Sequence, residues 1–316
     1  MIVLGIDTSN YTTSAALYDS STGVLYHKRR LLKVKSGELG LRQADAVFQH
    51  TVALPEIIEE LYRDTKLTPD VIAVSVRPDE TENSYMPCFM TGKCVADSMG
   101  KVFSVPVKYF SHQAGHIAAA LFSAGRLDLL KGELLAFHVS GGTTQAVKCS
   151  PDEEKIIKIE QLSSSLDLKA GQVIDRVGQL LEIPFPAGAQ LDSLSRESSR
   201  EYKIKPFMRD GCCSLSGLQN KCEKMYKDGE SNADIAKYCI DFITAALREM
   251  TKSLLEKNPG LPVIYSGGVM SNSLIREKFK KEFNAVFAEN GLSSDNAAGV
   301  AVLGAQANER TCVYGQ

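Results

Sequence analysis

Residues 2–18, IVLGIDTSNYTTSAALY, and residues 134–148, LLAFHVSGGTTQAVK, decide the fold of this chain. Each stretch is an apolar strand, a short polar turn and a second strand, so each predicts a β-hairpin. The first turn is Thr8-Ser9-Asn10, and the second contains Gly141 and Gly142. Two such hairpins in one chain indicate a duplicated architecture, in which each half opens on a hairpin whose turn faces a cleft.

A third stretch, LPVIYS at 261–266, runs into Gly267 and Gly268 and then into a predicted helix over 273–283. A strand, a glycine pair and a helix bring backbone N–H groups close to a phosphate or a nucleoside. Strands that alternate with helices indicate an α/β fold, with the ligand expected between two lobes. Further helices are expected at 44–64, where Pro55 predicts a kink or restart, at 233–256, and at 296–308 behind the capping residues 293–295.

A length of 316 residues suits two domains. The boundary is expected near 108–111, giving an N-terminal lobe over 1–108 and a C-terminal lobe over 109–294. The last helix, about 295–316, is expected to pack back onto the N-terminal lobe.

Composition excludes several classes of protein. With 44% apolar and 23% charged residues the chain is not disordered, and a net charge of -2 provides no global basic field for nucleic acid. No basic N-terminal region precedes Asp7, and no apolar run is long enough to span a bilayer, so neither a secretory signal nor a membrane partner is expected. The 8 cysteines contain no C-x-x-C pair, which favours reduced thiols and a cytoplasmic location.

A candidate metal site lies in SHQAGHIAAAL, where His112 and His116 are four residues apart. On a helix this spacing points both imidazoles the same way, although on the spacing alone two surface or half-buried histidines without a metal are the favoured interpretation. Gln113 stands where a zinc peptidase of the H-E-x-x-H type needs its glutamate, so peptidase chemistry lacks its general base. Asp295 is the best placed third ligand by sequence, and two histidines with one carboxylate suit iron.

Three turns, each directly after an apolar strand, are candidates for holding phosphate with main-chain N–H groups, and they lie at 8–10, 140–144 and 266–272. The turn after residue 139 is Ser140-Gly141-Gly142-Thr143, and Asn272, after the glycine pair at 267–268, could bond a base or ribose. Asp175 lies inside a predicted amphipathic helix, and its carboxylate could accept hydrogen bonds from ribose hydroxyls. A single aspartate on a helix is more commonly a solvent-exposed residue without such a role. A turn over 184–188 follows it.

Five basic residues cluster on a predicted strand near the N-terminus. Most such runs are solvated faces, so tRNA contact here is the less favoured interpretation. They are Lys28, Arg29, Arg30, Lys33 and Lys35.

Seven motifs together resemble the tRNA adenosine threonylcarbamoyltransferase family (TsaD-like), once labelled glycoproteases, and this chain looks like a diverged member. The resemblance is clearest over residues 2–18 and 109–305. The motifs are GIDTSNYTTSAAL, SHQAGHIAA, VSGGTTQ, GQVIDRVGQLLEIPFPAG, SLSGLQN, SGGVMSNSLIR and SDNAAGVA.

The resemblance implies a two-lobed actin/Hsp70/sugar-kinase fold with duplicated ribonuclease-H-like domains. It also implies transfer of a threonylcarbamoyl group from its adenylate to the tRNA adenosine beside the anticodon. One divalent metal ion, iron or zinc, would be held by His112, His116 and Asp295. ATP or an acyl-adenylate would be the ligand, and a homologous partner subunit or a homodimer is expected. The implied nucleotide-binding positions are Val139, Ser140, Gly141, Gly142, Thr143, Asp175, Gly188, Asp192, Gly267, Gly268 and Asn272, and the candidate catalytic residues are Asp7 and Ser9.

Several positions depart from the family pattern. Tyr11 and Thr12 stand where the family has an acidic pair, Asp7 replaces the glutamate, and Gln219 replaces a lysine. A glycine-rich G-P-G segment is replaced by VRPDETEN at 76–83. The departing positions also include Thr143, for a histidine, and Gln172, for an acid.

Two functions of different classes therefore stay open. One is a metal- and nucleotide-binding acyltransferase of the threonylcarbamoyl or carbamoyl type. The other is a non-catalytic or repurposed paralogue that acts as a partner subunit or ligand sensor. A small-molecule kinase ranks below both, because no segment supplies an aspartate base over a sugar pocket.

Overall fold

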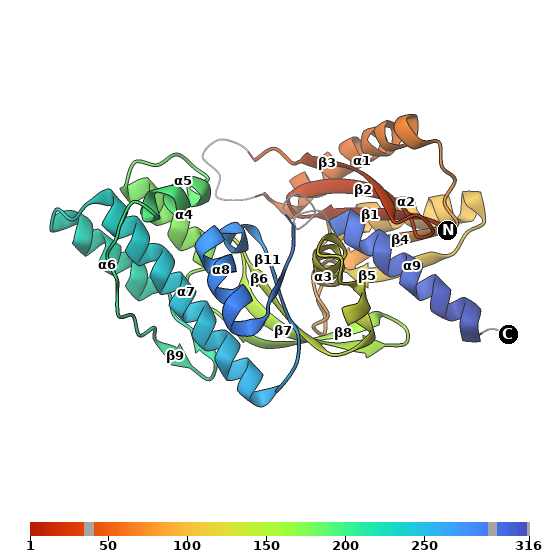
Figure 1. The fold of residues 1–316 in the computed structure, drawn as a ribbon. Helices are drawn as coiled ribbons and strands as arrows, with labels where there is room; N and C mark the ends of the chain where they lie inside the picture. The colour runs from red at the N-terminus through yellow and green to blue at the C-terminus, as the bar shows by residue number, and fades with distance from the viewer. Residues whose placement is uncertain (35–40, 290–295, 315–316) are drawn as a thin grey trace. The chain divides into compact units, whose positions relative to one another are not determined.

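The computed structural model describes residues 1–34, 41–289 and 296–314 of the chain (Figure 1). The chain divides into two compact units. Unit 1 comprises Met1–Gly132, Ser150–Ile159 and Ala288–Gln316, and unit 2 comprises Glu133–Cys149 and Glu160–Phe287. The domain boundary expected near residue 108 stays a prediction.

The first sheet and its helices belong to unit 1. The strands are β1 (Ile2–Ser9), β2 (Thr12–Asp19), β3 (Val24–Leu31), β4 (Val71–Arg77) and β5 (Val107–Ser111). The helices are α1 (Gln43–Thr65), α2 (Phe89–Phe103), α3 (His112–Ser123), the 3₁₀ helix η1 (Leu127–Lys131) and α9 (Asn296–Tyr314).

The second sheet carries the helices of unit 2. Its strands are β6 (Leu134–Val139), β7 (Thr144–Asp152), β8 (Ile156–Ser164), β11 (Val263–Ser266) and β12 (Val286–Phe287), and a separate hairpin is formed by β9 (Met208–Arg209) and β10 (Cys212–Cys213). The helices are α4 (Ala170–Leu180), α5 (Gly188–Ser195), α6 (Ser216–Lys227), α7 (Asn232–Lys257), the 3₁₀ helix η2 (Gly268–Ser271) and α8 (Ser273–Phe283).

The two sheets have the same topology, which confirms the predicted duplication. The first has the order β3-β2-β1-β4-β5 and the second, read from its other edge, β8-β7-β6-β11-β12. Strand β1 pairs antiparallel with β2 and parallel with β4. In the same way, β6 pairs antiparallel with β7 and parallel with β11. The carboxyl ends of β1 and β4 therefore meet at one edge, and so do those of β6 and β11.

The predicted helices are confirmed at 44–64, 233–256 and 273–283 by α1, α7 and α8. Pro55 lies inside α1, which continues through it. The helix expected from residue 296 begins there as α9, whereas its predicted cap at 293–295 lies outside the described residues.

Strand alternation sends the residues of β1 to two different layers. Leu4 and Ile6 pack with α1 and α2 in a buried cluster, whereas Gly5 lies against α9. A Cβ on Gly5 would come 2.1 Å from the carbonyl oxygen of Ala297, so only glycine allows α9 to lie this close. Since side chains alternate along a strand, Asp7 shares the side of Gly5 and Thr8 shares the side of Ile6.

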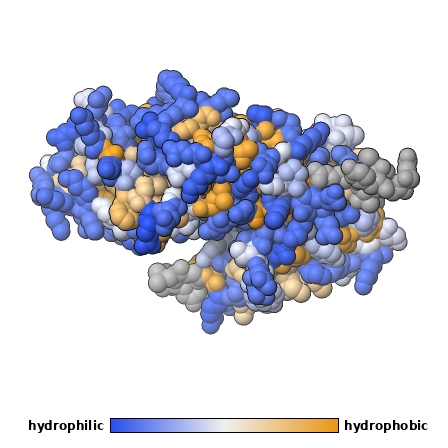
Figure 2. Space-filling model, turned by 90° about the horizontal axis from the view of Figure 1, so that it is seen from below, coloured by the Kyte–Doolittle hydropathy of each residue, from blue (hydrophilic) through white to orange (hydrophobic). Residues whose placement is uncertain are grey.

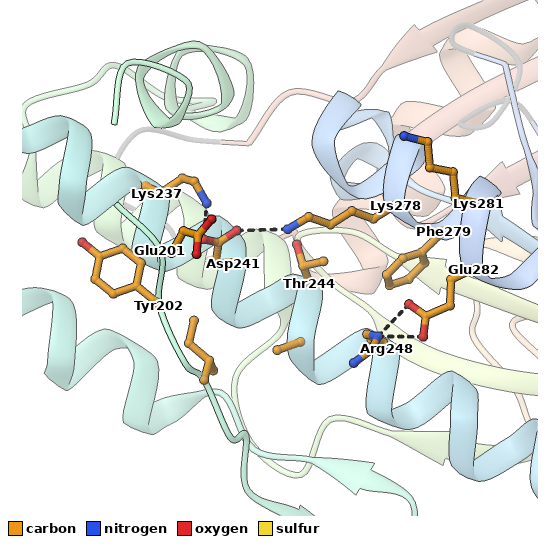
Figure 3. A pocket seen from close by; sticks show the side chains of 12 residues that line it. Glu201, Tyr202, Lys237, Asp241, Thr244, Arg248, Lys278, Phe279, Lys281 and Glu282 are labelled. Atoms are coloured by element: carbon orange, nitrogen blue, oxygen red, sulfur yellow. Dashed lines mark hydrogen bonds and ion pairs between the residues drawn. The ribbon is translucent and has the colours of Figure 1, made fainter. Parts of the chain in front are cut away.

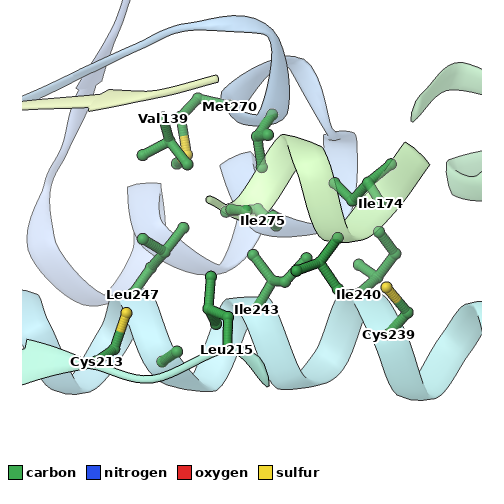
Figure 4. Packing of buried hydrophobic residues seen from close by; sticks show 14 of the residues in the cluster. Val139, Ile174, Cys213, Leu215, Cys239, Ile240, Ile243, Leu247, Met270 and Ile275 are labelled. Carbon is green, nitrogen blue, oxygen red and sulfur yellow. The ribbon is translucent and has the colours of Figure 1, made fainter. Parts of the chain in front are cut away.

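Unit 2 is built around α7. Its apolar stripe includes Ile240, Ile243 and Leu247, which are buried to 1% exposure or less against residues of α4 and α8 (Figure 4). The same cluster reaches Val139 at the end of β6 and Met270 in η2. The loops after β6 and β11 therefore rest directly on the core of unit 2.

The surface is that of a protein exposed to water. Figure 2 shows a largely hydrophilic face on which apolar residues gather in separate patches. None of the helices among the described residues is both long and apolar enough to cross a bilayer.

Candidate functional site

The two predicted groups of site residues lie in different units, and each is considered by itself. In unit 1, His112 is the first residue of α3 and His116 follows one turn later. Ser111 caps this helix, since its side chain accepts a hydrogen bond from the Ala114 N–H at 3.2 Å. The ring centroids of the two histidines are 4.6 Å apart and the rings are nearly perpendicular. The helix therefore presents two imidazoles side by side.

A buried carboxylate lies behind the first imidazole. Asp7, which is 1% exposed at the end of β1, has Oδ1 2.9 Å from Nδ1 of His112. The hydroxyl of Ser75, near the end of β4, donates to the same oxygen, and the Ser9 N–H donates to the other at 3.3 Å. Burial alone would raise the pKa of Asp7, but His112 and these donors lower it below its ordinary value. Asp7 is therefore held as an anion, and a His112 Nδ1–H fits as its donor.

Asn296, the residue after the predicted third metal ligand, also contacts His112. Asn296, 2% exposed, has its amide Nδ2 2.8 Å from Nε2 of His112. Its Oδ1 is buried and has no hydrogen-bond partner within the described part of the chain. Asp295 itself lies outside the described residues. Among those that are described, no three histidine, cysteine, aspartate or glutamate side chains form a group that could hold a metal ion.

Glycines set the distance between the two helices that meet at the histidines. A Cβ on Gly299 of α9 would lie 1.9 Å from the carbonyl oxygen of Gly115, and one on Gly115 would lie 3.2 Å from that of Asn296. The backbones of α3 and α9 thus touch between His112 and His116. A larger side chain at either glycine would push the start of α9 away from the imidazoles.

The second group lies at the carboxyl ends of β6 and β11 in unit 2. The turn after Val139 is closed by two hydrogen bonds, from the Ser140 N–H to the Thr143 carbonyl at 2.7 Å and from the Thr143 N–H to the Ser140 hydroxyl at 3.2 Å. Neither bond uses the N–H of Gly141 or Gly142. Both glycines are exposed, and a Cβ built on either would meet nothing within 4 Å. The turn therefore offers open backbone.

The loop after β11 lies directly against the end of β6. Gly267 has a φ of +96°, and a Cβ there would come 2.3 Å from the carbonyl oxygen of Val139. Gly268, the next residue, is exposed and has open space where a Cβ would be. The N-terminus of α4 also contacts the turn after β6, since the Gly171 N–H donates to the Ser140 carbonyl at 3.1 Å. Three glycine-bearing segments thus converge, although they are far apart in sequence.

The polar side chains predicted for this group hold the surrounding segments together. Asn272 caps α8, accepting from the Ile275 N–H at 3.1 Å, and Asp175 accepts from the Ala187 N–H at 3.0 Å, next to Gly188 at the start of α5. Asp192 accepts from the N–H and hydroxyl of Ser273 at 3.3 and 3.1 Å. Asn272 is 8% exposed, and its Nδ2 has no partner among the described residues. Among the described residues, this donor and Oδ1 of Asp192 are the buried side-chain atoms of the group that have no hydrogen-bond partner.

Sequence reasoning missed Ser75 and Asn296. Ser75 lies in the apolar strand VIAVSVR, where a hydroxyl without an expected partner was the available signal. The sequence predicts Asn296 only as the first residue of the last helix, without a contact to His112. Ser9 was predicted as catalytic, and its hydroxyl lies 3.5 Å from the Thr12 carbonyl of its own turn.

A sequence model of the family described as tRNA N6-adenosine threonylcarbamoyltransferase (TsaD) matches residues 38–302. The chain belongs to this family. A relative of that name from Buchnera aphidicola subsp. Acyrthosiphon pisum (strain Tuc7) is 27% identical over 96% of this chain and 92% of its own length. Another from Sulfurihydrogenibium sp. (strain YO3AOP1) is 28% identical over 96% of this chain and 90% of its own.

Solved structures place the TsaD-family chain in the actin/Hsp70/sugar-kinase fold. Full-length HypF in its phosphate- and nucleotide-bound form is similar with a TM-score of 0.62 and 14% identity, over 98% of this chain and 55% of HypF. The activator of 2-hydroxyisocaproyl-CoA dehydratase from Clostridium difficile, with bound ADPNP, gives a TM-score of 0.54 and 15% identity, over 99% of this chain and 98% of the activator. At these identities the likeness shows the fold, as expected from the sequence.

Proposed function

We propose that this protein is a metal- and nucleotide-binding transferase that moves a threonylcarbamoyl group from its adenylate to an adenosine of tRNA. Family membership supports the reaction, since relatives covering nearly the whole chain are named for it. The observation that carries the proposal is the open glycine backbone at Gly141, Gly142 and Gly268 beside the unused, buried amide of Asn272. Such a set of N–H donors suits the phosphate and ribose of an acyl-adenylate.

In unit 2 the chain would bind and orient the adenylate. The N–H groups of Gly141 and Gly142 would donate to phosphate oxygens, and Nδ2 of Asn272 would donate to the nucleoside. Asp175 and Asp192 would act as positioning residues, because they fix α5 and the start of α8 around these donors. Fixed donors cost little reorganisation when the ligand's charge shifts during transfer.

In unit 1 the residues fit one divalent cation, iron or zinc. The fit rests on two adjacent imidazoles, on the Asp7 carboxylate that orients one of them, and on the unpartnered buried oxygen of Asn296. His112, His116 and Asp295 would hold the ion. When bound, a cation supplies a Lewis acid that polarises ligand oxygens. Asp7 would keep Nδ1 of His112 protonated, so that Nε2 carries the lone pair, and the Asn296 amide that lies 2.8 Å from Nε2 would have to give way to the ion.

The first experiment separates nucleotide binding from stability. Serine caps helices as well as asparagine does, so Asn272→Ser should retain the cap of α8 but lose the amide donor. We expect an unchanged melting temperature and an adenylate Kd raised about tenfold, measured by calorimetric titration. Ser231→Ala is the matched control, because Ser231 caps α7 by accepting from Asp234 N–H at 3.1 Å. It should lower the melting temperature and leave the Kd unchanged.

The second experiment tests the reaction. The purified protein is given threonylcarbamoyl adenylate and tRNA, and modified adenosine is measured by mass spectrometry. Metal content is measured for the wild type, for His112→Ala, which should lose the ion, and for His27→Ala on the exposed strand β3, which should retain it. A protein that binds metal and adenylate but modifies no tRNA, alone or with partner proteins, would be a non-catalytic paralogue, and the proposal would be wrong.

A further inference from the structure

Unit 2 carries a groove of about 690 Å³ between α7, α8 and the segment before β9. We call it the α7–α8 groove. Figure 3 shows that Lys237 and Lys278 approach Asp241 from two sides, and that Arg248 meets Glu282 deeper along the groove. Every element that lines it belongs to unit 2.

Positive charge exceeds negative charge along this groove. Asp241 is shared by Lys237 and by Lys278, whose Nζ is 3.4 Å away. Glu282 is shared by Arg248, at 2.6 Å, and Lys252, at 3.4 Å. Asp241 and Glu282 thus each face two cations, whereas Glu201, the third carboxylate that lines the groove, adds one negative charge. The side chain of Lys278 is 54% exposed, so its charge remains accessible to a ligand.

A basic strip runs beside the groove. Along residues 202–209 the side chains alternate between partly or fully buried and exposed. The exposed positions are Lys203, Lys205, Phe207 and Arg209, which we call the basic strip. Among the described residues, the three cations have no ion-pair partner within 4.0 Å, and the Phe207 ring is 61% exposed.

The alternation gives the strip one chemical face. Tyr202 and Ile204, on the inner side, line the groove, and the Tyr202 hydroxyl donates to the Asp234 carbonyl at 3.2 Å. The inner residues therefore anchor the segment against α7. The outer residues present cations two residues apart, as in an extended chain, with an aromatic ring among them.

The basic cluster on β3 differs in this respect. On β3, Lys28 lies 2.7 Å from Asp64, and Arg30 is bound by Glu56 and Glu60, all on α1. These cations are neutralised within the protein. A polyanion gains most from cations that have no such partner, because it releases its counterions without breaking ion pairs.

We propose that the basic strip and the α7–α8 groove form an RNA-binding surface, on which the cations follow the phosphate backbone and Phe207 stacks on an unpaired base. This inference rests on the proposed function, which supplies tRNA as the acceptor. An exposed aromatic ring among cations is the combination that binds single-stranded segments of RNA without reading their sequence. An acidic protein partner would use the cations but would leave the ring without a role.

The experiment measures tRNA binding by fluorescence anisotropy over a series of salt concentrations. We expect Lys203→Ala/Lys205→Ala to weaken binding about tenfold near 0.1 M salt and to reduce the slope of log K against log salt by about 2. The control, Lys221→Ala/Lys224→Ala, removes the same charge from exposed positions of α6 and should change neither quantity. Phe207→Ala should weaken binding about tenfold and leave the salt slope unchanged.

Adenylate affinity is measured on every variant and should equal that of the wild type. Equal tRNA binding in the strip variant and its control would overturn the proposal and leave the proposed function intact. So would a surface that binds poly-glutamate as tightly as tRNA with the same sensitivity to the strip variants. A wild type that binds tRNA through the strip but no adenylate would instead contradict the proposed function alone.

Discussion

The end of β1 in unit 1 and the end of β6 in unit 2 occupy equivalent positions in two sheets of the same strand order, yet they are built differently. At the end of β1 the polar contacts are made by side chains, since Asp7 faces His112 and the Thr8 hydroxyl donates to the Cys88 carbonyl at 2.9 Å. At the end of β6, open glycine backbone takes their place. One topology thus provides a carboxylate–imidazole site and a backbone-amide site, because different residues stand at the end of the first strand and in the segments that meet it.

The largest effect is expected at the end of β6, where the site consists of open glycine backbone. Gly267→Ala places a Cβ at positive φ and against the Val139 carbonyl, so it should destabilise unit 2 by about 3 kcal/mol. Urea unfolding monitored by circular dichroism gives the value. Gly268→Ala is the matched control, because a Cβ there meets nothing within 4 Å. Equal losses from the two variants would show that the close approach at Gly267 is not what constrains the loop.

A smaller effect should follow at the side-chain end. Asp7→Asn retains the size of the side chain but removes the anion that orients His112, so metal affinity should fall about 10- to 100-fold. Competition with a chromophoric chelator measures this affinity. Asp19→Asn, at the far end of the adjacent strand β2, should leave it unchanged. An unaltered affinity in Asp7→Asn would mean that the carboxylate only fills space.

The next effect depends on pH and tests how Asp167 holds the start of α6. Asp167 accepts hydrogen bonds from the Ser214 hydroxyl at 2.6 Å and from the N–H groups of Leu215 and Ser216. Although its partial burial would raise the pKa of Asp167, these donors lower it well below its ordinary value. The ionised form therefore stabilises the fold above the unfolded pKa, and this contribution is lost as pH falls through the folded pKa.

Asp167→Asn should consequently cost about 1 kcal/mol near pH 7, and the two unfolding free energies should converge as the pH falls well below about 4. Urea titrations at several pH values measure both curves. Asp228→Asn, at the exposed end of α6, serves as the control and should follow the wild type. A difference that stays constant with pH would exclude the ionised carboxylate as its source.

The smallest effect is expected where cations are already paired at the surface. Lys28→Ala removes an exposed ion pair with Asp64 on α1, which should change neither the melting temperature nor tRNA affinity measurably. Differential scanning calorimetry and the anisotropy assay provide the two readings. A marked loss of tRNA affinity would move the RNA surface from the basic strip to β3.

Local patterns in the sequence predicted much of this. The hairpins at 2–18 and 134–148 predicted the duplicated topology. Helix α8 begins at the predicted residue because Asn272 caps it, and it ends at Phe283 because Asn284 takes up the left-handed conformation. The spacing of His112 and His116 placed both on one helix. Their roles as metal ligands, like the nucleotide-binding roles in unit 2, stay predictions.

Other features depend on contacts between distant residues. The bond from Ser75 to Asp7 joins residues 68 apart, and the approach of Gly115 to Gly299 joins two helices from different segments of unit 1. No periodicity records such pairs. Asp175 and Asn272 were predicted as ligand groups, whereas the structure also uses them to hold a turn and a helix end. The type of a residue indicates which hydrogen bonds its side chain can form, and the fold determines which partners lie within reach of it.

The crossing of α3 and α9 has a consequence for motion. With no side chain between Gly115 and Gly299, there is no soft layer to absorb a displacement of one helix relative to the other. A displacement of α9 near Asn296 should therefore also move α3 and the two imidazole rings that α3 carries.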